Sequence, residues 1–198
     1  MKHREPTLNR RKAVADILKG RGDALVVAGL GAPCWDIAAA GDSPLNFYLW
    51  GGMGGAAMIG LGLALAQPKR RVLVITGDGE MLMGLGSLAT IGVQRPRNLA
   101  VIVMDNERYG ETGMQLTHTR LGVELAGVAK ASGFSTAGTV YTAAQLKTWI
   151  PRLFRAPGPV FATIKVTTQP APMVLPVRDG PTLKNRFRHA LLGDKAFA

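Results

Sequence analysis

Two short polar motifs in the chain carry the oxygen atoms that a bound metal ion needs. Gly77-Asp78-Gly79 follows one apolar run, and Asn106 follows the next apolar run along the chain. The glycines let the backbone approach a phosphate closely, but the Asp78 carboxylate would repel a phosphate unless a cation lay between them. Mg²⁺ takes oxygen ligands and commonly bridges protein groups to phosphate oxygens. The motifs therefore predict a Mg²⁺-bound phosphate, with Asp78 and Asn106 as ligands.

Each motif alone has an ordinary structural explanation. Gly-Asp-Gly occurs in many turns, and Asp-Asn after a strand is a common way to begin one. The combination is more specific, because both motifs stand at the carboxyl ends of successive predicted strands that a single helix separates. In a parallel sheet such ends lie side by side, and ligands bind in the crevice outside them.

An alternation of short apolar runs and amphipathic segments positions these motifs. The predicted strands are residues 24–28, 46–50, 71–76, 99–104, 135–140 and 160–166. The predicted helices are residues 8–19, 35–40, 54–66, 81–92, 121–132, 143–155 and 183–192. This order predicts a single α/β domain, with a doubly wound, mostly parallel sheet and helices on both faces.

The composition suits one compact domain with short appendages. The chain has 198 residues, of which 47% are hydrophobic and 19% charged. We expect an N-terminal basic helix over residues 1–20, a central domain over residues 21–168, and a Pro-rich arm with a final helix over residues 169–198.

The net charge of +11 and the single cysteine bear on partners and location. Basic residues gather in segments 2–12, 69–71 and 178–195, which we interpret as solvated faces or partner contacts and not as a nucleic-acid site. Cys34 has no partner for an internal disulfide, and the charged N-terminus is unlike a secretory signal. The most apolar stretch, residues 53–66, is shorter than a bilayer span requires. We expect a cytoplasmic protein with no membrane or nucleic-acid partner.

The spacing of the two motifs resembles a known family. Gly77-Asp78-Gly79, 26 further residues and then Asn106 are similar to the diphosphate motif of thiamine diphosphate-dependent enzymes. The resemblance implies the thiamine diphosphate-binding fold for the central domain, and Mg²⁺ held by Asp78, Asn106 and the main-chain carbonyl of Arg108. Asp105 and Glu80 depart from the family pattern, which often has Asn and Ser or Ala there, and the role of Glu80 stays open.

The resemblance extends upstream over residues 49–64, which are similar to the segment that packs against the cofactor's aminopyrimidine ring. It implies that Met53 holds the cofactor in a bent V shape and that the Gly51 carbonyl accepts a hydrogen bond from the 4′-amino group. Simple core packing is the other explanation for Met53. The cofactor-binding residues that the resemblance implies are Gly51, Gly52, Met53, Gly77, Asp78, Gly79, Glu80, Asn106, Arg108, Tyr109 and Gly110.

Residues 45–135 look most like the β-type, diphosphate-binding subunits of sulfopyruvate decarboxylase and the corresponding part of phosphonopyruvate decarboxylase. That likeness implies decarboxylation of a small 2-oxo acid to an aldehyde and CO₂. The loop over residues 109–117 is similar to one that borders the substrate, so Glu111, Thr112 and Gln115 are candidate substrate contacts. His118 is a candidate acid–base group, because imidazole titrates near neutrality, although a lone loop histidine is more often simply exposed.

One part of such a site is missing from the chain. In the family, a Glu from a pyrimidine-binding domain activates the cofactor, and residues 20–167 are already used by one sheet. We therefore expect a pyrimidine-binding α subunit in a hetero-oligomer, α₂β₂ or larger. Alternatives are a subunit of a carboligase or of a 2-oxo acid oxidoreductase, whose iron–sulfur cluster Cys34 alone could not ligate. A non-catalytic phosphate or nucleotide module built on Gly29-Leu30-Gly31 is a further alternative, although the third Gly of a dinucleotide fingerprint is absent.

Overall fold

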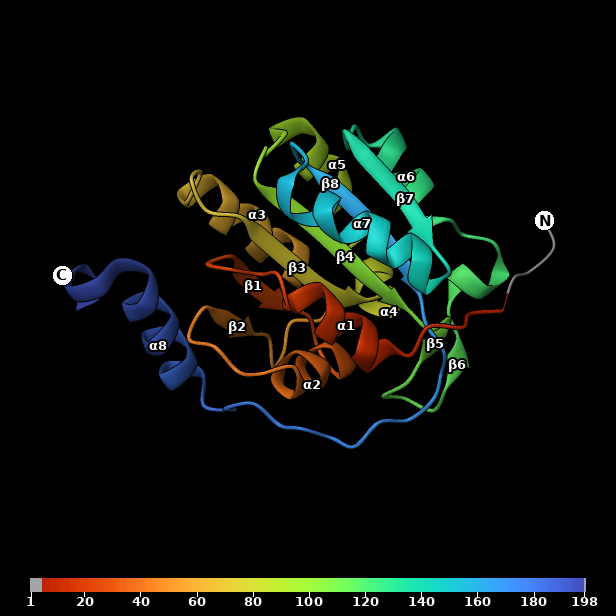
Figure 1. Cartoon of the computed structure of the whole chain (residues 1–198), viewed down its shortest axis with the longest axis horizontal. Coiled ribbons are helices and arrows are strands. Elements are labelled where there is room, and N and C mark those ends of the chain that lie inside the picture. The colour runs from red at the N-terminus through yellow and green to blue at the C-terminus, as the bar shows by residue number, and fades with distance from the viewer. Residues whose placement is uncertain (1–4, 198) are drawn as a thin grey trace.

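The protein, seen in a computed structural model that describes residues 5–197, is built on one six-stranded parallel sheet (Figure 1). Across the sheet the strands run β2 (Asn46–Tyr48), β1 (Leu25–Ala28), β3 (Val72–Gly77), β4 (Leu99–Asp105), β8 (Val160–Lys165) and β7 (Thr136–Val140). Strands β1, β4 and β8 are buried at every position, as expected for a sheet with both faces covered. The predicted fold class is confirmed.

Helices cover the sheet on both faces and enclose two apolar cores. One face carries α1 (Arg10–Leu18), α2 (Ala32–Ala39) and α7 (Ala143–Arg155), as Figure 1 shows toward the viewer. The other face carries α3 (Ala56–Ala66), α5 (Ser87–Gln94) and α6 (Leu125–Ala131). Because β1 pairs with β2 on one side and β3 on the other, the winding direction reverses at β1. The carboxyl ends of β1 and β3 therefore border the crevice where such folds bind ligands.

One predicted helix is divided in the structure. The helix predicted over residues 81–92 is two helices, α4 (Asp78–Met83) and α5, which are separated at Gly84 to Gly86. The chain breaks there because Gly84 lies against Gly54, and a Cβ on Gly84 would come 2.3 Å from the Gly54 carbonyl oxygen.

The polar loop after β4 is more structured than predicted. It contains a small hairpin, β5 (Arg108–Tyr109) and β6 (Gln115–Leu116), and a 3-10 turn, η1 (His118–Leu121). The helix predicted from residue 121 begins instead at Leu125, because the Glu124 side chain caps α6 by accepting a hydrogen bond from Gly127 N at 2.6 Å.

The terminal segments pack on the domain. Residues 1–4 of the predicted basic helix lie outside the described part, but Arg10 and Arg11 are not simply solvated, because both pair with the buried carboxylate of Asp36. The final helix α8 (Gly180–Leu192) begins three residues earlier than predicted, and 3-10 turn η2 (Gly193–Phe197) follows it. Phe187 of α8 packs edge-on against Phe47 of β2. Within residues 5–197, every helix is too short or too polar to cross a membrane.

Candidate cofactor and metal site

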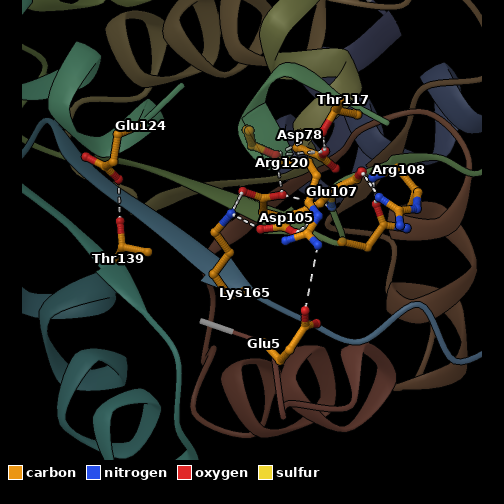
Figure 2. A network of polar contacts seen from close by, with 12 residues as sticks. Glu5, Asp78, Asp105, Glu107, Arg108, Thr117, Arg120, Glu124, Thr139 and Lys165 are labelled. Atoms are coloured by element: carbon orange, nitrogen blue, oxygen red, sulfur yellow. Dashed lines mark hydrogen bonds and ion pairs between the residues drawn. The ribbon is translucent and has the colours of Figure 1, made fainter. Parts of the chain in front are cut away.

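Asp78 lies where β3 passes directly into α4, at the carboxyl edge of the sheet. The β3–β4 register pairs Gly77 with Met104, so Asp78 stands beside Asp105 and close to Asn106. The Asp78 side chain is buried, with 2% of the residue exposed, and its Oδ2 accepts a 2.6 Å hydrogen bond from the Thr117 hydroxyl (Figure 2). The predicted neighbourhood of Asp78 and Asn106 is therefore present.

The turn after β4 orients Asn106 and the chain beyond it. Asp105 Oδ1 accepts a hydrogen bond from Glu107 N, and Asn106 Oδ1 accepts one from Arg108 N, both at 3.0 Å. These consecutive Asx turns hold Glu107 at a φ of 61°, which non-glycine residues rarely adopt. The carbonyls of Glu107 and Tyr109 accept hydrogen bonds from Thr117 N and Met114 N, so by strand alternation the Arg108 carbonyl points away from the hairpin.

Met53, Gly79 and Tyr109 meet from three different parts of the chain: the loop before α3, the first turn of α4 and strand β5. A Cβ placed on Gly79 would lie 2.7 Å from two ring carbons of Tyr109 and 3.6 Å from Cε of Met53. Gly79 therefore lies beneath the tyrosine ring and the methionine methyl, and no larger residue fits there. Met53 is itself 37% exposed, so it is only partly explained by core packing.

The loop that carries Met53 is held against Gly84, at the end of α4. Gly52 and Gly54 have φ values of 68° and 92°, and Gly55 N donates to the Gly52 carbonyl at 2.9 Å. A Cβ on Gly54 would lie 3.1 Å from Gly84 N, so the two backbones touch without a side chain between them. Gly51 is exposed at the mouth of this turn.

The electrostatics of Asp78 favour a bound cation. No described lysine, arginine or histidine forms an ion pair with this carboxylate. Burial and then the neighbouring Asp105 carboxylate raise the pKa of Asp78 to about 7, against the lowering effect of the Thr117 hydrogen bond. A divalent ion would supply the missing positive charge. The donors offered, a carboxylate, an amide and a main-chain carbonyl, are oxygen ligands of the kind that Mg²⁺ takes.

The donor set expected here differs from a carboxylate or histidine cluster. The described residues hold no group of three His, Cys, Asp or Glu side chains arranged for a metal ion. A set with one carboxylate, one amide and one carbonyl leaves several coordination positions for phosphate oxygens and water, as is usual for Mg²⁺.

Glu80 turns away from Asn106 and toward β1. Its Oε2 accepts hydrogen bonds from the Thr76 hydroxyl at 2.7 Å and from Leu30 N at 2.8 Å. A Cβ on Gly29 would come 2.2 Å from that same oxygen, so Gly29 makes room for Glu80. Glu80 thus joins the β1–α2 loop to the base of α4, and the Leu30 amide is already engaged within the protein.

The predicted substrate-side residues lie on the exposed hairpin tip after Arg108. The Thr112 hydroxyl donates to Gln115 Oε1 at 3.0 Å, and Gln115 Nε2 donates to the Thr112 carbonyl at 2.9 Å, so these two residues bond to each other. Glu111 reaches toward the β1–α2 loop, where a Cβ on Gly31 would lie 3.0 Å from Glu111 Oε1. His118 is exposed, and no described residue hydrogen-bonds to its imidazole. Gly110 is exposed at the start of the tip.

Three residues beside Asp78 were not predicted from the sequence. Thr117 and Thr119 are buried with their hydroxyls 2.9 Å apart, and Thr119 donates to Asp105 Oδ1 at 2.8 Å. Lys165 Nζ lies 2.8 Å from both Asp105 Oδ2 and Glu107 Oε1 (Figure 2). Burial alone would lower the pKa of Lys165, but these two carboxylates raise it above its usual value. The sequence contained one signal for these residues: a lysine within the apolar run of residues 160–166, which is unusual for a buried strand. Isolated threonines give no such signal.

Comparison with known proteins gives a consistent family. The chain is 40% identical to the sulfopyruvate decarboxylase subunit beta of Methanothermobacter thermautotrophicus over 172 residues, which are 87% of this chain and 88% of that protein. It is 45% identical to the phosphonopyruvate decarboxylase of Streptomyces viridochromogenes over 112 residues, which are 57% of this chain and 28% of that protein.

A solved structure has the same fold. It belongs to a protein from Mycobacterium smegmatis that is assigned to the thiamin diphosphate-dependent enzymes, with a TM-score of 0.70 at 22% identity. The likeness covers 82% of this chain but only 32% of that one. The model of the thiamine pyrophosphate enzyme C-terminal TPP binding domain matches residues 32–164, which include every residue of the Asp78 and Asn106 neighbourhood apart from Lys165. The chain therefore belongs to the C-terminal, TPP-binding domain family of the thiamine pyrophosphate enzymes.

Proposed function

We propose that the chain is the diphosphate-binding subunit of a two-chain, thiamine diphosphate- and Mg²⁺-dependent 2-oxo acid decarboxylase. The observation that carries the proposal is the meeting of Asp78 and Asn106 at adjacent strand ends, next to the Gly79 surface under Met53 and Tyr109. The relatives named as sulfopyruvate and phosphonopyruvate decarboxylases support this reaction type. Their names suggest a small 2-oxo acid that carries a second anionic group and is converted to an aldehyde and CO₂.

In this proposal Asp78, Asn106 and the Arg108 carbonyl would hold Mg²⁺. Gly77, whose Cβ position is open, would leave room for the diphosphate, and Gly79 would line the site under Met53 and Tyr109. Thiamine diphosphate, when bound, supplies the thiazolium that takes up the electron pair released as CO₂ leaves. The chain's own residues would bind and orient it: Met53, which is partly exposed, would contact its rings, and the carbonyl of the exposed Gly51 would accept a hydrogen bond from its amino group. Gly52, Tyr109 and Gly110 would line the same proposed cofactor site. Glu80 would stabilise it indirectly, through its hydrogen bonds to Thr76 and Leu30 N.

The substrate would enter from the side of the exposed hairpin. Glu111, Thr112, Gln115 and His118 are the proposed contacts on this chain, with His118 as the candidate proton carrier. Thr112 and Gln115 already hydrogen-bond to each other, so they would present one joined polar surface. Groups that recognise the second anionic substituent would come partly from the partner.

The partner that we propose is a pyrimidine-binding α subunit that supplies the activating Glu, in an α₂β₂ or larger assembly. Relatives named subunit beta support a second chain. The exposed surface of α3 and α5 would suit contact with this partner, because neither helix contains a charged residue. We further propose that the cofactor-binding unit spans residues 21–168 and that the enzyme works in the cytoplasm.

The phosphate-module alternative gains little support from its glycines. Gly29 is explained by its contact with Glu80, and the Leu30 amide donates to Glu80 rather than facing solvent. A subunit of a carboligase or 2-oxo acid oxidoreductase would use the same cofactor site. Product identification separates these: a decarboxylase releases CO₂ and an aldehyde without a second carbonyl substrate or an electron acceptor.

The test is Mg²⁺-dependent cofactor binding by the chain purified with its partner. Calorimetry should detect thiamine diphosphate binding that EDTA abolishes and that Asp78→Ala weakens at least about a hundredfold, because a charged metal ligand is lost. Asp194→Ala, which removes an exposed carboxylate at the far end of the chain, is the matched control and should bind like wild type. Equal affinity of Asp78→Ala and wild type would overturn the proposed metal site.

A further inference from the structure

Thr117 donates the shortest described hydrogen bond to the Asp78 carboxylate. Thr117 is fully buried, at 0% exposure, and its hydroxyl lies 2.6 Å from Asp78 Oδ2. The other oxygen of that carboxylate, Oδ1, accepts no hydrogen bond from a side chain of residues 5–197. The two oxygens are therefore unequal: Oδ2 is held by a side chain at short distance, whereas Oδ1 has no side-chain donor among residues 5–197 and is available to a ligand. The backbone N–H of Asp78 is a further donor to this carboxylate.

The hydrogens available in this cluster define the direction of each bond. Thr117 and Thr119 have one hydroxyl hydrogen each. Thr119 lies 2.8 Å from Asp105 Oδ1, against 3.5 Å from Asp78 Oδ2, so Asp105 is its nearer acceptor. The short hydrogen bond to Asp78 Oδ2 therefore comes from Thr117 at 2.6 Å, and Thr119 reaches the same oxygen only at 3.5 Å.

The far side of the cluster keeps Thr117 in place. Its main-chain N–H donates to the Glu107 carbonyl at 3.1 Å, which fixes the backbone from which the hydroxyl projects. Asp105 and Glu107 are in turn held by Lys165 at the end of β8, as Figure 2 shows. Thr117 therefore lies in a turn that several hydrogen bonds and ion pairs hold in place, so its hydroxyl is suited to hold the Asp78 carboxylate in one orientation.

We propose that Thr117 is a positioning residue that holds Asp78 by Oδ2, so that Oδ1 is presented to the metal ion and small octahedral ions are preferred. The inference rests on the proposed function of the site. Mg²⁺ demands near-ideal octahedral geometry with short bonds, whereas Ca²⁺ accepts longer bonds and both oxygens of one carboxylate. A carboxylate that is fixed by one oxygen suits Mg²⁺. A carboxylate that rotates freely lowers the affinity for Mg²⁺ more than the affinity for Ca²⁺.

The experiment uses the chain with its partner and saturating thiamine diphosphate, with MgCl₂ or CaCl₂ as the titrant in calorimetry. Thr117→Val keeps the size and branching of the side chain but removes the hydroxyl. Its Mg²⁺ dissociation constant should rise about tenfold, the loss of one hydrogen bond to a charged group, while that for Ca²⁺ should change less than about threefold. Thr117→Ser, which keeps the hydroxyl, should restore the Mg²⁺ preference.

Thr163→Val is the matched control for replacing a buried threonine by valine. Thr163 lies in β8 at 1% exposure, and its hydroxyl has no hydrogen-bond partner among the described residues. This variant should keep the wild-type constants for both ions. If Thr117→Val does not give folded protein by its melting curve, Thr117→Ala takes its place with the same expected outcome.

Failure of the inference and of the proposed function are distinguishable. If Asp78→Ala binds Mg²⁺ and cofactor like wild type, the proposed function fails. If Asp78→Ala abolishes binding but Thr117→Val keeps the wild-type ratio of Mg²⁺ to Ca²⁺ affinity, only the role of Thr117 is overturned. Equal losses for both ions, or a Thr117→Ser variant as weak as Thr117→Val, would likewise overturn it.

Discussion

Replacing Lys165 with methionine should leave two buried carboxylates without their shared cation. Lys165 Nζ is 2.8 Å from Asp105 Oδ2 and 2.8 Å from Glu107 Oε1, and these side chains are 1% and 7% exposed. Removing one partner of a buried ion pair costs about 3–5 kcal/mol. Glu107 keeps a weaker contact with Arg120 at 3.8 Å, so we expect the lower end, about 3 kcal/mol.

For a chain of this length, that loss corresponds to a fall in melting temperature of roughly 6–12 °C, which calorimetry or circular dichroism resolves. Lys147→Met is the control, because Lys147 is exposed on α7 and makes no described ion pair. It should change the free energy of unfolding by less than about 0.5 kcal/mol.

A double variant tests whether the charge is the cause. Asp105→Asn removes one negative charge but keeps an oxygen for Glu107 N and Thr119, so combining it with Lys165→Met should recover at least about 1 kcal/mol of the summed single losses. The reasoning is refuted if Lys165→Met costs less than about 1 kcal/mol, or if the two losses simply add.

Three further predictions concern stability away from the site. Burial, with a smaller effect of Glu80, raises the pKa of Cys34 from 9.0 to about 12, so the unfolded chain binds fewer protons above pH 9 and stability falls with rising pH. Unfolding curves should show wild type losing about 2 kcal/mol more than Cys34→Ala between pH 9 and about pH 10.5, and parallel losses would contradict this. Gly92→Ala should destabilise the chain by at least about 2 kcal/mol, because its Cβ would lie 1.7 Å from the Ser132 carbonyl oxygen. Gly62→Ala, in open space on α3, should instead gain about 0.5–1 kcal/mol in the same denaturant assay, and a loss there would count against the argument.

The sheet was predictable because each strand is an apolar run between turn residues. The strands predicted at residues 71–76 and 99–104 are β3 and β4 to within one residue at each end. The break between α4 and α5 was not predictable, because the apolar spacing continues through it and its cause is the distant Gly54. Apolar periodicity indicates which face of a helix is buried, but it does not indicate which loop packs against that helix.

The site was predictable where a residue type is chemically specific. Asp78 and Asn106 stand at strand ends, and strand order alone brings them together. The contacts of Thr117 were not predictable, because a hydroxyl in a loop serves many roles and its partner is 39 positions away. The direction of the Glu80 side chain, toward β1, could not be predicted from the sequence either, since it depends on the space that Gly29 leaves in the β1–α2 loop.

The backbone contact between Gly54 and Gly84 divides the molecule into parts that differ in their tolerance of change. With no side chain between them, the Met53 turn and the α4–α5 joint form one unit, and a single added methyl group on Gly84 would force them apart. The hairpin tip over residues 111–116, beyond the proposed cofactor contacts Tyr109 and Gly110, is exposed instead, and Glu111 approaches the β1–α2 loop at Gly31. Variant libraries for new substrates should therefore randomise the tip and leave both glycines unaltered, since the tip can be redesigned without disturbing how the cofactor is held.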